Sequence, residues 1–303
     1  MKDIYLYEFH IALTQILSII VNIKHEVNNS MKHNKWGEKM SESNSKLGLT
    51  AKQIADFHRD GYVIARGYYN ESEINKLQDK ALNDDNLYQS AWDKKDASGT
   101  VSKVCLWQEL GDDFYSMFSR GKRLADAVED ILQEPVFHTT TKIMMKEPFV
   151  GGAWEWHQDY GYWATDNYHL YPKLVSCMIA INRATVENGC LQVLKGSHHI
   201  GRINHAKTGD QKGADMTFVD EALKYLELVN VELEPGDTLF FHCNLLHKSN
   251  QNKSKDPRWV MIAAYCAESA KPFKENSLKY RPLEKLEDSA ILSWPDIAPL
   301  CVS

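Results

Sequence analysis

The stretch "VFHTTTKIMMKEP", residues 136–148, marks the point where the sequence changes from helical to strand patterning. It is rich in β-branched residues, and it follows Pro135, which ends the helical periodicity of residues 119–133. Further short β-branched or aromatic runs come after it, separated by turn signals such as Asn188-Gly189 and Pro235-Gly236. These runs cover residues 173–184, 189–198, 226–236, 237–247 and 258–267.

The residues before Pro135 indicate helices. Residues 49–61 have amphipathic spacing with Thr50 as the expected N-cap, and residues 70–85 are capped by Asn70 or Ser72. A β-rich run at 62–69 separates them. Helices followed by strands with long connections predict a mainly β fold: a double-stranded β-helix (jelly roll, cupin-like) with flanking N-terminal α-helices. We place its core at about residues 136–268.

Length and composition agree with one large domain. The 303 residues are 43% hydrophobic and 25% charged, and no Pro- or Gly-rich linker divides residues 49–303. The apolar run 11–23 is too short and interrupted for a membrane span, so we expect no stable membrane insertion. Residues 25–48 are polar. Residues 1–48 are therefore expected to be a flexible or poorly ordered extension, with Met40 as an alternative start.

Charge and cysteine content limit the classes of partner and the cellular compartment that we expect. The formal net charge is −6 and the basic residues are scattered, which argues against a nucleic-acid partner. The six cysteines are far apart and form no CxxC motif, as expected for free thiols in a reducing compartment. We therefore expect a cytoplasmic protein, monomeric or homodimeric, that acts on a small molecule.

The stretch "GGAWEWHQDYGYW", residues 151–163, suggests a metal site. On an extended strand, His157 and Asp159 would point the same way, and an imidazole with a carboxylate suits Fe(II). A third ligand should come from a distant strand, with His242 and His247 as candidates. A single histidine among the 12 in the chain is more often a structural residue than a metal ligand. The assignment of ligands therefore depends on the segments that surround each histidine.

That context resembles the phytanoyl-CoA dioxygenase family of Fe(II)- and 2-oxoglutarate-dependent oxygenases, over roughly residues 50–268. The matching segments are "WHQD" (156–159), "ENGCLQVLKGSHHIGRINH" (187–205), "PGDTLFFHCNLLHKSNQN" (235–252) and Arg258. The resemblance implies that His157, Asp159 and His247 bind the metal, whereas His242 does not. It also implies that certain residues bind the cosubstrate 2-oxoglutarate: Arg258 at its far carboxylate, then Ser249, Gln158, Lys103, Lys142 and Met178.

Two of these positions depart from the family pattern. Lys142 stands where close relatives often carry Met, and Met178 stands where they carry Trp. We expect cosubstrate binding to survive both changes while the shape of the pocket differs.

The resemblance further implies Fe(II), 2-oxoglutarate and O₂ as cofactors, with ascorbate as a candidate addition. Oxidative decarboxylation of 2-oxoglutarate to succinate and CO₂ would drive oxidation of a substrate C–H bond. Hydroxylation, oxidative cyclisation and desaturation are all open outcomes. Asp159 argues against a halogenase, in which that carboxylate is replaced to make room for halide.

The substrate is less constrained. The aromatic residues around the HxD step can line a pocket or pack in the core, and the polar loop after residue 194 can meet a substrate or solvent. We favour a small polar or amino-acid-like metabolite; the alternatives are an acyl-CoA or lipid substrate and a non-catalytic jelly-roll metal-binding protein. The candidate substrate residues are Trp154, Tyr160, Tyr162, Trp163, Lys195 and Arg202.

Overall fold

The computed structural model describes residues 48–274, 280 and 282–295, and these form antiparallel sheets flanked by helices. The predicted extension lies outside the described residues except for Gly48, as does the alternative start at Met40. Among the described residues, no helix is long and apolar enough to cross a membrane.

Two sheets build the core. The larger has the strand order β1-β11-β6-β13-β4-β3-β2, and the smaller has the order β10-β7-β12-β5. The larger sheet contains β1 (Tyr62–Ala65), β2 (Trp92–Lys95), β3 (Val101–Trp107), β4 (Val136–Lys146), β6 (Leu174–Ala180), β11 (Thr238–His242) and β13 (Arg258–Ala267). The smaller contains β5 (Trp154–His157), β7 (Leu191–Leu194), β10 (Leu228–Val231) and β12 (His247–Ser249), and a separate hairpin pairs β8 (His205–Thr208) with β9 (Gln211–Ala214).

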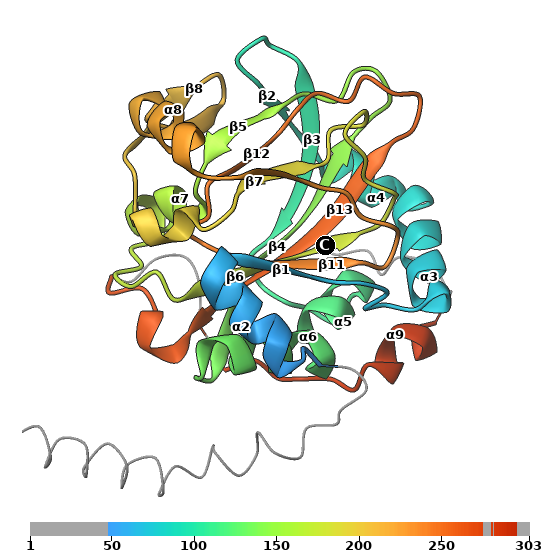
Figure 1. Ribbon diagram of the computed structural model, residues 1–303. Helices are drawn as coiled ribbons and strands as arrows, with labels where there is room; N and C mark the ends of the chain where they lie inside the picture. Colours follow the sequence, from blue (N-terminus) through green and yellow to red (C-terminus); the bar gives the residue numbers. More distant parts are fainter. Residues whose placement is uncertain (1–47, 275–279, 281, 296–303) are drawn as a thin grey trace, which may run out of the picture. The chain divides into compact units, whose positions relative to one another are not determined.

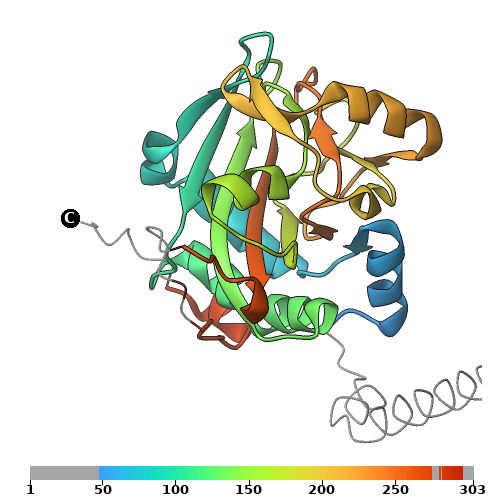
Figure 2. The ribbon, with the colours of Figure 1, turned by 90° about the vertical axis from the view of Figure 1, so that its left-hand side faces the viewer.

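Helices cover one side of the larger sheet (Figure 1). In Figures 1 and 2, α8 lies on the side of the sheets away from α6. The helices are α2 (Ala51–Asp60), α3 (Glu71–Leu82), α4 (Asp85–Ser90), α5 (Phe114–Arg120), α6 (Lys122–Leu132), α7 (Asp159–Asp166), α8 (Met216–Tyr225) and α9 (Ser289–Ser293), with short 3₁₀ turns at Ser197–Ile200 and Glu268–Ala270.

The larger sheet is apolar on both faces, as the continuous hydrophobic runs of its central strands require. On β13, Met261 and Ala263 pack with the helices, whereas Val260 and Ile262 face the smaller sheet. This period-two alternation gives one core under the helices and another between the sheets. Two antiparallel sheets packed in this way form the predicted jelly roll, which is confirmed together with its N-terminal helices.

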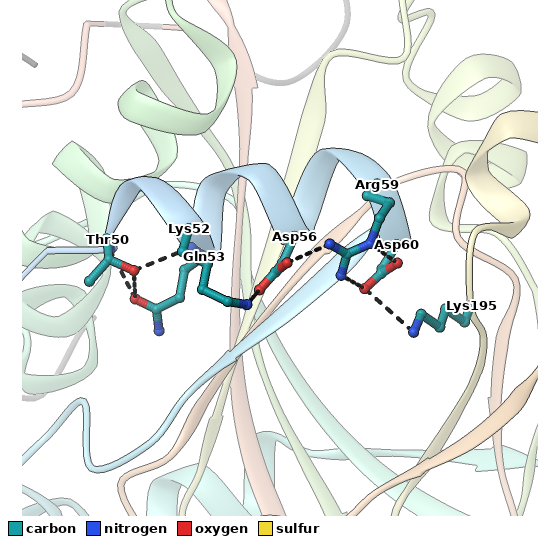
Figure 3. Close-up of polar contacts among 7 residues, drawn as sticks. All are labelled: Thr50, Lys52, Gln53, Asp56, Arg59, Asp60 and Lys195. Carbon is teal, nitrogen blue, oxygen red and sulfur yellow. Dashed lines mark hydrogen bonds and ion pairs between the residues drawn. The ribbon is translucent and has the colours of Figure 1, made fainter.

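The first predicted helix begins and ends where its sequence indicates. Thr50 Oγ1 accepts from the Gln53 amide, and Gln53 Oε1 accepts from the Thr50 amide at 2.9 Å, which completes a capping box (Figure 3). Gly61 ends the helix with φ of 83°. A Cβ at Gly61 would lie 2.5 Å from His198 Nδ1, so glycine is required there on two counts.

Two predicted elements are divided in the structure. The helix expected over 119–133 is two helices, because Gly121 adopts an extended backbone with ψ of 130° between α5 and α6. The run 237–247 is also not one strand. It forms β11 in the larger sheet, crosses between the sheets after His242, and resumes as β12 in the smaller sheet at His247. That crossing brings the end of the run to β5.

Asp96 ties the turn between β2 and β3 to the smaller sheet. Its buried carboxylate accepts hydrogen bonds from the amides of Ser98, Thr100 and Ala153 and from Gln251 Nε2, each at 2.8–2.9 Å. Burial opposes ionisation, but hydrogen bonds from the Gln251 side chain, the Ser98 hydroxyl and the amides of Ala153 and Thr100 lower the pKa of Asp96 to about 2. The hydrogen bonds therefore hold the segment that leads into β5.

We expect Asp96→Ala to lower the free energy of unfolding by about 2–4 kcal/mol, because several buried donors lose their acceptor. Asp93→Ala, which removes an exposed partner of Lys103 on the same hairpin, should cost less than about 1 kcal/mol. Urea denaturation at neutral pH measures both. Because the folded pKa of Asp96 is depressed, its contribution should be present above the unfolded value and disappear as the pH falls towards 2. Equal losses for the two variants would contradict this role.

Candidate metal and cosubstrate site

A cavity lies between the inner faces of the two sheets. Its walls come from β4, β6, β11 and β13 on one side and from β5, β7, β12 and the start of α7 on the other. The lining residues are Lys142, Met144, Trp154, His157, Asp159, Met178, Leu191, Phe241, His247, Ser249, Arg258 and Ile262.

Three potential metal ligands converge in this cavity. The antiparallel register of β5 and β12 places His247 directly opposite His157, and their ring centroids are 4.1 Å apart. Asp159 Oδ1 lies 3.9 Å from Nε2 of each histidine. Among the described residues this is the one group of His, Cys, Asp or Glu side chains with such metal-binding geometry, and all three side chains are buried.

Hydrogen bonds orient each ligand. Nδ1 of His157 donates to the Glu155 carbonyl at 2.7 Å, and Nδ1 of His247 donates to the Leu245 carbonyl at 2.8 Å. A carbonyl can only accept, so the proton of each neutral ring lies on Nδ1 and the Nε2 lone pair is free. Asp159 Oδ2 accepts from Ser176 Oγ at 2.6 Å, which leaves Oδ1 for a metal.

The charge states also suit a divalent cation. Burial lowers the pKa of His157 and of His247, so both rings are neutral at pH 7. Burial opposes ionisation of Asp159, but Lys142 and the two imidazoles lower its pKa, so it is a carboxylate. Two neutral imidazoles and one carboxylate are the donor set that non-haem iron takes.

The geometry differs in one respect from the sequence argument. His157 is the last residue of β5, but Asp159 is the first residue of α7, so they do not alternate along one strand. Gln158 makes the turn between them: its side chain donates to the carbonyls of Gly201 and Asn244 and accepts from the Ile203 amide. Gln158 therefore holds the HxD turn from outside the cavity instead of lining it.

Arg258 is a buried cation without an acidic partner. Its Nε and Nη2 donate to the Gly189 carbonyl at 3.1 and 2.7 Å, and among the described residues no carboxylate pairs with it. Burial lowers its pKa to about 10, which still leaves the guanidinium charged at pH 7. Trp154 also lines the cavity, and its buried indole N–H has no acceptor. These unused donors fit an anionic ligand at the end formed by Arg258, Ser249 and Trp154.

Several expected site residues do not line the cavity. Lys103 pairs with Asp93 on the β2–β3 hairpin, and Lys195 lies near Asp60 at the end of α2 (Figure 3). Tyr160 donates to the carbonyls of His169 and Leu170, and Trp163 packs in the same hydrophobic cluster. Arg202 is exposed in the loop before β8. The sequence does not reveal these positions, because each depends on contacts that only the folded chain makes.

Other expected residues lie at the cavity. Lys142, Met178, Ser249 and Trp154 line it. Tyr162 lies beside the site, with its ring edge-on to His157 at 5.9 Å between centroids and its hydroxyl bonded to the backbone of Lys212.

His242 is kept away from the triad. It is the last residue of β11, its Nδ1 accepts from the Asn244 amide, and its ring packs beside Phe57 and His198. Burial, with smaller effects from neighbouring histidines, lowers the pKa of His242 to about 3.

Ser176 is the site residue that sequence reasoning missed. It is the one hydroxyl in the buried strand "LVSCMIA", and its place on the inner face follows from its period-two spacing with Met178. A polar side chain in a fully buried strand needs a partner, and that requirement could have identified it.

Comparisons with known proteins identify the family of the chain. The family model of phytanoyl-CoA dioxygenase (PhyH) matches residues 57–260, which is more than half of the chain. L-proline trans-4-hydroxylase of Streptomyces griseoviridis is 28% identical over 169 residues, covering 51% of this chain and 63% of that protein. Ectoine dioxygenase of Sphingopyxis alaskensis is 25% identical over 259 residues, covering 77% of this chain and 82% of that protein.

Solved structures give the same fold. EctD from S. alaskensis with 2-oxoglutarate and 5-hydroxyectoine has a TM-score of 0.64 at 23% identity, covering 81% of this chain and 90% of that chain. The chain belongs to the phytanoyl-CoA dioxygenase (PhyH) family. It is an iron- and 2-oxoglutarate-dependent dioxygenase, as the resemblance predicted.

All five described cysteines are buried free thiols, as predicted, and none is among the potential metal ligands.

Ser176→Ala should weaken binding of Fe(II) by about 10–100-fold, because Asp159 loses the hydrogen bond that orients its carboxylate. Anaerobic Fe(II) titration measures this. Ser119→Ala removes a buried hydroxyl bonded to Thr141 in the helical layer and serves as the matched control, with unchanged metal affinity. If both variants bind Fe(II) like the wild type, Ser176 has no part in positioning Asp159.

Proposed function

We propose that this enzyme oxidises a C–H bond of a small polar or amino-acid-like metabolite and converts 2-oxoglutarate to succinate and CO₂. The observation that carries the proposal is the His-Asp-His donor set in the same cavity as a buried arginine without an acidic partner. When bound, iron and 2-oxoglutarate supply the oxidising power, and the chain supplies orientation and shelter from water.

We assign the metal to His157, Asp159 and His247. Their free Nε2 and Oδ1 atoms face one another, and their other polar atoms are hydrogen-bonded. A set of three protein ligands leaves further coordination positions for a chelating cosubstrate and O₂.

We assign the far carboxylate of 2-oxoglutarate to Arg258, with Ser249 beside it. A guanidinium can donate two parallel hydrogen bonds to a carboxylate, and a buried position strengthens them. Trp154 N–H is a further donor at the same end of the cavity.

Relatives favour a small substrate. Three named relatives are an L-proline trans-4-hydroxylase, an ectoine dioxygenase and a methylphosphonate hydroxylase. An acyl-CoA substrate is the alternative suggested by the plant phytanoyl-CoA dioxygenase, which is 25% identical over 254 residues. A screen of small metabolites and acyl-CoAs for substrate-triggered succinate formation tests the choice, and product mass separates hydroxylation from cyclisation or desaturation. A response confined to acyl-CoAs would overturn the small-metabolite proposal.

His157→Ala, Asp159→Ala and His247→Ala should each abolish Fe(II)-dependent succinate formation, because two remaining ligands do not hold the metal. His242→Ala is the matched histidine control and should keep most activity, because its ring lies beside Phe57 and His198. The assay is succinate release with Fe(II), 2-oxoglutarate and O₂. An inactive His242 variant beside an active His247 variant would show that the third ligand is wrongly assigned.

Arg258→Lys should raise the dissociation constant of 2-oxoglutarate by about 10–100-fold. Lysine keeps the positive charge but cannot donate two parallel hydrogen bonds to one carboxylate. One charge-assisted hydrogen bond, worth roughly 1.5–3 kcal/mol, is therefore lost. Fe(II) affinity without cosubstrate should stay within about twofold, because Arg258 is not a metal ligand. Titration of both constants decides the matter, and an unchanged 2-oxoglutarate constant would mean that another cation carries the carboxylate.

A further inference from the structure

Three aromatic side chains of the described residues contact the imidazoles of the metal triad. The ring centroids of Trp154 and Tyr162 lie 6.1 and 5.9 Å from that of His157, and the ring of Phe241 lies 5.0 Å from that of His247. Each ring places C–H bonds of the chain itself beside the atoms assigned to the metal. A filled and closed site protects a reactive centre from side reactions, so these rings are at risk when the substrate is absent.

Tyr162 is held beside the triad at both ends of its side chain. It lies three residues after Asp159 on α7, so the two side chains are neighbours on one face of the helix. Its ring stands edge-on to His157, with an interplanar angle of 87°. Its hydroxyl accepts from the Lys212 amide at 2.8 Å and donates to the Lys212 carbonyl at 2.9 Å. The ring therefore cannot turn away from His157 without breaking both hydrogen bonds.

Trp154 lies on the other side of His157, towards the end assigned to the cosubstrate. In the pairing of β5 with β12, Trp154 lies opposite Ser249, whereas His157 lies opposite His247. Bound 2-oxoglutarate would cover Trp154 at that end. Tyr162, on the α7 side, would stay uncovered until a primary substrate binds.

Phe241 is enclosed by the core. Its side chain is 2% exposed and packs in the hydrophobic cluster between the two sheets. A hydroxyl added to that ring would be a polar group in a filled interior, which is costly. Tyr162 is partly exposed, so its ring has room for one more oxygen atom. Its phenol is also richer in electrons than the phenyl ring of Phe241 and is therefore oxidised more readily.

We propose that Tyr162 is a self-oxidation site, whose ring is hydroxylated to a catechol when the enzyme consumes 2-oxoglutarate without its primary substrate. The proposal rests on the proposed function, because it takes the metal and 2-oxoglutarate to occupy the positions assigned above. One oxygen atom of O₂ enters succinate as 2-oxoglutarate loses CO₂, and the other enters a C–H bond of the ring. The keto acid and the ring each give up one pair of electrons, which reduces O₂ completely. The hydrogen of the broken C–H bond is balanced by the proton of the new hydroxyl.

The test incubates the full chain with Fe(II), 2-oxoglutarate and isotopically labelled O₂, with no other substrate, and then locates the label by mass spectrometry. Cleavage after Lys146 and Lys173 releases one peptide that contains Trp154 and Tyr162, and fragmentation separates the two positions. We expect one labelled oxygen atom at Tyr162. Protein loaded with Zn(II) in place of Fe(II) should carry no label.

Tyr162→Leu removes the ring and should lose the label from this peptide. Tyr160→Phe is the matched control, because the Tyr160 hydroxyl donates to the carbonyls of His169 and Leu170 on another side of α7. It should still be labelled at Tyr162. The position of the label in the wild type decides the proposal without any variant, so it does not depend on whether Tyr162→Leu folds.

The proposal is overturned if succinate forms without a primary substrate while Tyr162 stays unlabelled, or if the label lies at Trp154 or Phe241. It is also overturned if succinate forms only after a metabolite from the screen is added, because the ring would then not be oxidised in its place. Failure of the proposed function is distinct, since no succinate would then form with or without any metabolite or acyl-CoA.

Discussion

The pairing of β12 with β5 is the constraint on which the site depends. It sets His247 opposite His157, and each imidazole is fixed by a backbone carbonyl two residues earlier in its own chain segment. β12 reaches this place only because the chain leaves the larger sheet after His242 and crosses to the smaller one. The crossing residues Leu245 and Leu246 are fully buried, so hydrophobic packing fixes the register that aligns the two ligands.

The net charge inside the cavity is set by the charged side chains that line it. Asp159 is the acidic side chain that lines the cavity, while Arg258 and Lys142 line it as cations. Lys146 is buried next to Arg258, and burial first and Arg258 second hold its pKa well below the ordinary range. Lys146 donates to the Asn250 carbonyl and does not line the cavity, so Arg258 is the cation that an anion meets at its end of the cavity. With a divalent metal at the triad, the positive excess matches ligands that bring carboxylates.

Local sequence patterns were sufficient for the elements whose shape depends on near neighbours. The helix after Thr50 has its cap, its periodicity and its terminal glycine within a dozen residues. The central strands can be predicted from their β-branched and apolar runs. The metal triad was predicted through family resemblance, since spacing alone left His242 and His247 open. Gln158 and Lys195 lie elsewhere than at the cavity because their hydrogen bonds or ion pairs involve distant segments, which no local pattern encodes, and Lys103 pairs with Asp93 across its own hairpin. The hairpin of β8 and β9 was missed because its strands are short and partly exposed.

The separation of metal binding from substrate choice has a structural basis in this fold. The triad depends on backbone pairing and on buried hydrogen bonds, so a change there disturbs the core between the sheets. Lys142 and Met178 lie on central strands whose backbone groups are paired whatever side chain they carry. Replacing either side chain alters the cavity wall without breaking a strand pair, at the cost of a local change in packing. The same sheets can therefore hold one metal centre while substitutions on the inner face change which molecule lies beside it. Relatives that are 25–28% identical carry the names L-proline trans-4-hydroxylase, ectoine dioxygenase and methylphosphonate hydroxylase.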